Sequence, residues 1–128
     1  MIYEAYVSFE TAKLLKEKGF DECIFEFYEG DRIRYARNEE GFRLSELPDI
    51  YYPHITDQMA MAWLREAHKV LIVIDAYHAD HWEGYIDSFE IKIYSHASTI
   101  IVPNEIAYHT DYTEAVETAL KYSLENLI

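Results

Sequence analysis

The densest group of side chains that could bind a metal ion lies between Asp75 and Glu83. Within this segment, Asp80 stands between the imidazoles of His78 and His81. Divalent ions of borderline softness, such as Zn²⁺ and Ni²⁺, accept mixed nitrogen and oxygen ligands, so these three side chains could hold such an ion. Their spacing matches no specific metal site, and a polar hairpin loop in an acidic protein has the same composition. The sequence therefore favours a polar loop without a cofactor and leaves a metal-dependent enzyme as the alternative.

Four aromatic residues fall outside the periodic apolar patterns of the chain. Tyr51 and Tyr52 precede a proline in a segment without periodicity, and Trp82 and Tyr85 lie near the tip of a predicted hairpin. Tyrosine and tryptophan anchor protein interfaces because they bury a large rigid area and keep a polar group. These four residues are the predicted binding residues. The competing interpretation is that their loops fold back and bury the rings at the edge of the core.

The chain contains none of the short motifs that carry well-understood catalytic chemistry. Its four glycines are isolated, which excludes a P-loop and a dinucleotide-binding fingerprint. Neither a GxSxG elbow nor an HExxH helix occurs. The only cysteine, Cys23, lies in an alternating apolar segment, which predicts a buried and unreactive thiol. No catalytic residue is predicted, and the sequence favours a protein that is not an enzyme.

The charge and composition of the chain limit the classes of partner that it can bind and the cellular compartment that is expected for it. Against 11 Lys and Arg stand 24 Asp and Glu, a net charge of −13, which is opposite to the sign that direct binding of a nucleic-acid backbone requires. The N-terminal residues lack the pattern of a signal peptide, and the longest aliphatic run, residues 70–74, is far shorter than the ~20 residues of a membrane span. With one cysteine, the sequence predicts a cytoplasmic protein without a membrane partner.

The secondary-structure pattern predicts one α+β domain over residues 1–128. Helices are expected at residues 8–19, 56–67 and 112–127, where capping residues precede an apolar stripe. Strands are expected at residues 22–28, 32–37, 70–77, 89–94 and 99–102. The order is α-β-β-α-β-β-(β)-α, and hairpins separated by single helices indicate an antiparallel-rich sheet with helices packed on it.

Three details of this pattern are specific enough to test. The first two strands are expected to form a hairpin over a three-residue loop, with Phe27 opposite Ile33. Residues 70–77 are apolar at nearly every position, which predicts a central strand covered on both faces. Residues 38–54 contain Gly41 and two prolines without a sustained period, which predicts a long loop.

Three stretches resemble, in this order, an uncharacterised family of small proteins encoded by Bacteroides-type bacteria and their phages or prophages. They are residues 7–21 (VSFETAKLLKEKGFD), 61–68 (MAWLREAH) and 112–120 (YTEAVETAL). The family has no assigned activity, so the resemblance implies a relation to phages or prophages and transfers no site residues.

Taken together, these features favour a small acidic module that binds another protein. A more specific alternative is a nucleic-acid mimic, whose carboxylates imitate phosphates and occupy a DNA-binding protein. A homodimer that pairs through an exposed sheet edge is also compatible with the pattern.

Overall fold

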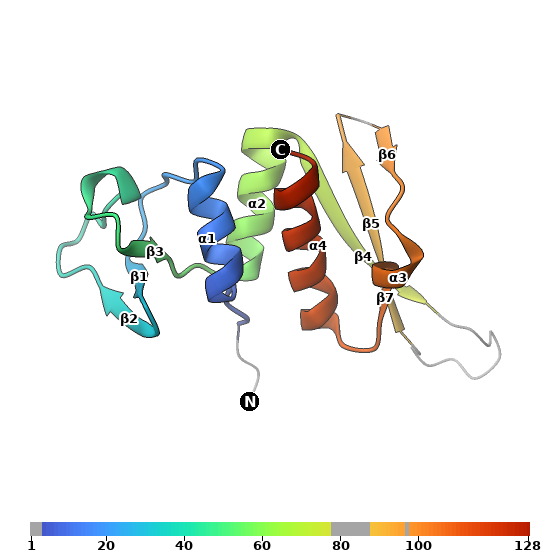
Figure 1. Ribbon diagram of the computed structural model, residues 1–128, viewed down its shortest axis with the longest axis horizontal. Coiled ribbons are helices and arrows are strands. Elements are labelled where there is room, and N and C mark those ends of the chain that lie inside the picture. The colour runs from blue at the N-terminus through green and yellow to red at the C-terminus, as the bar shows by residue number, and fades with distance from the viewer. Residues whose placement is uncertain (1–3, 78–87, 97) are drawn as a thin grey trace.

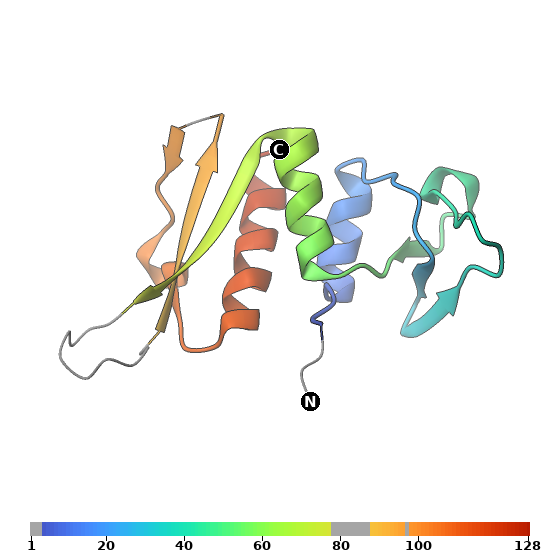
Figure 2. The same ribbon diagram turned by 180° about the vertical axis from the view of Figure 1, so that it is seen from behind.

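The computed structural model describes residues 4–77, 88–96 and 98–128 and shows an α+β fold in which helices separate two antiparallel sheets. Figure 1 shows the smaller sheet on one side, the larger sheet on the other, and α1 (Phe9–Glu17), α2 (Asp57–His68) and α4 (Tyr112–Asn126) between them. The view from behind in Figure 2 shows the same order of layers. The predicted α+β class is therefore confirmed, with two sheets in place of one.

The three long helices begin where their capping residues predict. The side chains of Ser8, Thr56 and Asp111 accept hydrogen bonds from backbone N–H groups in the first turns of α1, α2 and α4. Such caps satisfy N–H groups that have no partner inside the helix. A short helix, α3 (Asn104–Ala107), was not expected.

The smaller sheet contains β1 (Glu26–Glu29) between β2 (Arg32–Tyr35) and β3 (Tyr51–Pro53). The expected three-residue hairpin loop is wrong, because Gly30 adopts φ +62° and allows a two-residue turn, which places Phe27 opposite Arg34. The expected long loop at residues 38–54 is also wrong. It contains the 3₁₀ helix η1 (Leu44–Glu46) and β3, which completes the sheet.

The larger sheet consists of β4 (Val70–Tyr77), β5 (Ser88–Ser95), β6 (Ser98–Ile100) and β7 (Tyr108–His109). β5 is central, since it pairs with each of the others. The prediction of a central β4 covered on both faces is wrong. β4 lies at an edge and only its helix-facing side is buried, whereas Leu71 and Val73 on the outer side are 42% and 37% exposed.

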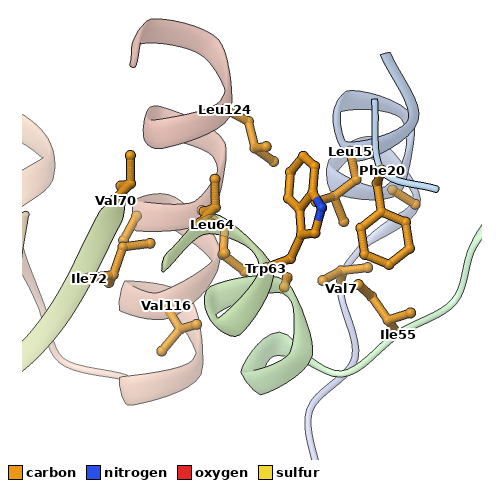
Figure 3. Packing of buried hydrophobic residues seen from close by; sticks show 14 of the residues in the cluster. Val7, Leu15, Phe20, Ile55, Trp63, Leu64, Val70, Ile72, Val116 and Leu124 are labelled. Carbon is orange, nitrogen blue, oxygen red and sulfur yellow. The ribbon is translucent and has the colours of Figure 1, made fainter. Parts of the chain in front are cut away.

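A continuous apolar core runs through the helical layer and joins both sheets. Figure 3 shows Trp63 of α2 near Leu15 and Phe20, while its neighbour Leu64 lies toward Val70 of β4. The Trp63 and Phe20 rings meet edge to face, with centroids 5.4 Å apart. Within the described ranges, every helix is too short or too polar to span a lipid bilayer.

Candidate functional site

The predicted metal and binding residues divide between described and undescribed parts of the chain. His78, Asp80, His81, Trp82 and Tyr85 lie outside the described residues. Among the residues that are described, His, Cys, Asp and Glu side chains form no group of three or more that could hold a metal ion. Of the predicted site residues, Tyr51 and Tyr52 are the two that lie in the described part of the chain.

Tyr51 and Tyr52 are neighbours on β3, so their side chains point to opposite faces of the smaller sheet. The Tyr51 ring packs edge to face on Phe27, with centroids 6.2 Å apart. The Tyr52 ring packs in the same way on Phe9 at 5.1 Å, and the Lys16 ammonium lies 4.6 Å from the Tyr52 ring centroid. Both rings are half-buried, so each belongs to the edge of the core and also reaches the surface.

Tyr51 lines a surface hollow with a volume of about 700 Å³. We call this hollow the β2 groove, and it is lined by residues 33–38 together with Phe27, Phe42, Leu47 and Tyr51. Phe27 and Tyr51 lie on the same face of the sheet. Phe27 of β1 pairs with Pro53 of β3, and Tyr51 is two residues from Pro53 along β3, so both side chains point to the same side. β2 itself and the residues that follow it supply residues 33–38, Phe42 lies before η1, and Leu47 lies directly after η1. The groove is therefore mainly apolar and aromatic.

The groove carries positive charge in a strongly acidic protein. Its lining contains two arginines, Arg34 and Arg37, and no acidic residue. Arg34 donates from Nε to Glu29 Oε2 at 2.7 Å, and this contact holds the pKa of the Glu29 carboxyl below its usual range. Arg37 is exposed and forms no ion pair with any residue in the described ranges. Its guanidinium is free to bind a carboxylate at the groove.

β2 also presents an open sheet edge beside the groove. The Ala36 N–H donates to the Phe25 carbonyl at 2.8 Å, which fixes the alternation of the hairpin hydrogen bonds. The backbone groups of Ile33 and Tyr35 therefore point away from β1. All four residues of β2 are exposed, and the Tyr35 side chain is 66% exposed. An extended segment of another chain could pair with this edge.

Most of the groove was not predicted from the sequence. Phe42 and Leu47 lie in the segment interpreted as a loop, where no period indicates a common surface. The sequence signal that points to this surface is the alternation of arginine with Ile33 and Tyr35, because arginine and tyrosine are enriched at protein interfaces.

A second polar cluster lies between the helices, around the N-terminal turns of α1 and α2. Glu117 of α4 accepts hydrogen bonds from the hydroxyls of Ser8 and Thr11. Asp57 is 5% exposed, and its Oδ1 has no hydrogen-bond partner among the described residues. Burial, with a further contribution from the negative charge of Glu117, raises the pKa of Asp57 to about 6. The buried members of this cluster are closed off from a substrate, so we assign the cluster to stability.

Cys23 does not occupy the predicted buried position. It is exposed, lies before β1, and its Sγ–H donates to the Glu40 carbonyl at 2.7 Å. The chain bends at Phe25, so Ile24 and Phe27 are buried while Cys23 and Phe25 are not. The alternation expected through residues 22–28 therefore breaks in the middle.

Comparison with protein-family models, curated proteins and solved structures finds no match. The resemblance to the Bacteroides-type and phage-encoded family stays a prediction.

Proposed function

We propose that this protein is a small interaction module that binds an extended segment of another protein in the β2 groove. The observation that carries the proposal is the combination of an apolar groove, an unpaired arginine and an open strand edge at one place. The segment would carry a large apolar side chain next to a carboxylate.

The open edge explains how such a segment would be held. A peptide strand added beside β2 would pair with the outward backbone groups of Ile33 and Tyr35. Side chains of an added strand alternate between the two faces, so every second side chain would enter the groove over Phe27 and Tyr51. Backbone pairing would provide affinity, and the groove would select the side chains.

The arginines explain why a carboxylate is expected despite the net charge of −13. Salt at physiological strength screens exposed charges beyond about 8 Å, so acidic residues elsewhere on the surface repel the segment weakly. A carboxylate in contact with Arg37 gains a charge-assisted hydrogen bond, which is stronger than a neutral one. The local pair therefore outweighs the distant repulsion.

A display of random extended peptides, selected on the purified protein, tests this proposal. We expect the enriched peptides to share an apolar residue near an acidic one. The Tyr35→Ala and Arg37→Glu variants should bind these peptides at least about tenfold more weakly in a fluorescence polarisation titration, which corresponds to about 1.4 kcal/mol. Tyr35 and Arg37 are exposed, so both variants should fold normally.

Arg65→Glu provides the matched control, because Arg65 is an exposed arginine of α2 that does not line the groove. It changes the net charge as Arg37→Glu does and should leave binding unchanged. Enrichment of no common pattern, or equal losses in Arg37→Glu and Arg65→Glu, would contradict the proposal.

A further inference from the structure

The outer edge of β4 is a full-length strand edge without a partner among the described residues. The His96 N–H donates to the Lys69 carbonyl at 3.2 Å, which fixes the alternation of hydrogen bonds between β4 and β5. The backbone groups of Val70, Ile72 and Ile74 therefore point away from β5. Figures 1 and 2 show β5 along one edge of β4 only.

This edge lacks the features that usually prevent pairing with another chain. Edge strands are commonly protected by proline, lysine, a bulge or short length. β6, at another edge of the sheet, has three residues and is soon followed by Pro103. β4 has eight residues, and residues 70–74 are all aliphatic. Leu71 and Val73 add exposed apolar side chains on the outer face of the same strand.

We infer that β4 pairs antiparallel with β4 of a second copy, about a two-fold axis at Ile72. The two larger sheets would then form one continuous sheet. In this register, Leu71 of each copy lies opposite Val73 of the other. Lys69, the left-handed residue that precedes β4, comes level with Asp75 of the other copy, within reach of its long side chain. A two-fold interface requires such self-complementarity, because each contact occurs twice with the roles exchanged.

The charges along β4 favour one register of pairing, and they favour a second copy of this chain as the partner. An axis at Val73 would place the apolar Leu71 opposite Asp75, and an axis at Ile74 would place Val73 opposite Asp75. The axis at Ile72 instead pairs each exposed Lys69 with an Asp75 carboxylate, which also contacts Lys92 of its own chain at 2.8 Å. β4 and the lysine that precedes it thus provide both halves of a matched interface. A second copy satisfies it without any other protein.

Sedimentation velocity over a range of protein concentrations tests the dimer. We expect a dimer whose fraction rises with protein concentration. Val73→Lys should weaken the dimer at least tenfold. Ile101→Lys is the matched control, since Ile101 is 89% exposed and lies beyond β6, so it should leave the dimer intact.

Exchanging the charges of Lys69 and Asp75 distinguishes pairing in this register from non-specific hydrophobic association. Lys69→Glu alone and Asp75→Lys alone should each weaken the dimer, and the double variant should restore it. The double variant keeps the net charge at −13, so its recovery cannot come from total charge. A wild-type protein that stays monomeric at all concentrations, a dimer equally sensitive to Ile101→Lys, or a double variant that does not recover would overturn the proposal. Circular dichroism of each variant verifies that it is folded.

Discussion

Replacing Gly41 with alanine is expected to lower the free energy of unfolding by about 3 kcal/mol. Gly41 has φ +73°, where a Cβ atom costs about 1 kcal/mol. That Cβ would also lie 2.6 Å from the Ile24 carbonyl oxygen. This oxygen accepts the Phe42 N–H at 2.9 Å, and the Ile24 N–H donates to the Phe42 carbonyl at 3.0 Å. Relieving the overlap means separating the two segments, and each lost hydrogen bond costs about 1 kcal/mol.

Gly30→Ala is the matched control for this prediction. Gly30 has φ +62°, but a Cβ there would meet no atom within 4 Å. The free energy of unfolding of Gly30→Ala should therefore fall only by the conformational cost of about 1 kcal/mol. Urea denaturation of both variants measures the difference, and equal losses would show that the contact with Ile24 is unimportant. Because Phe42 lines the β2 groove, Gly41→Ala should also weaken peptide binding, whereas Gly30→Ala should not.

Helices were predictable from the sequence because their signals are local. Each of the three long helices is capped by a side chain that accepts a backbone N–H group from two or three residues further along the chain. The capping residues are Ser8, Thr56 and Asp111. A cap and an apolar stripe depend on the helix itself and not on its neighbours in space. The three predicted starts were confirmed for this reason.

Strand partners were less predictable because pairing is not local. The aliphatic run of β4 is compatible with a strand buried on both faces, and also with an edge strand whose outer face carries exposed apolar residues. Only the positions of β5 and the helices distinguish these cases. Likewise, Tyr51 was identified from its residue type, but Phe42 and Leu47 join it in the groove through a segment without periodicity. Of the residues that line the candidate groove, the sequence therefore singles out only Tyr51.

The wild-type protein is expected to be more stable at pH 5 than at pH 7.5, because of Asp57. Its pKa in the folded protein is about 6, against an ordinary value of 3.8. Between these values the folded state binds more protons than the unfolded state, so stability falls as the pH rises through this range. The whole shift corresponds to about 3 kcal/mol, and about 1.4 kcal/mol of it falls between pH 5 and pH 7.5, because the carboxyl of the unfolded chain is already mostly ionised at pH 5. The dipole of α2 favours the ionised form by only about 0.3–1 kcal/mol, so burial and Glu117 dominate.

Asp57→Asn should remove most of this pH dependence and should stabilise the protein at pH 7.5, since it replaces a buried charge with a neutral group of similar shape. Thermal denaturation at pH 5, 6 and 7.5 measures both effects. Glu117→Gln should flatten the profile only in part, because burial is the larger cause of the shift and glutamine still offers an acceptor to Ser8 and Thr11. Asp31→Asn removes the same charge at the exposed hairpin turn and should leave the profile unchanged. A wild-type profile that rises from pH 5 to pH 7.5 would mean that Asp57 is ionised in the folded state without penalty, and that water or a cation reaches its Oδ1.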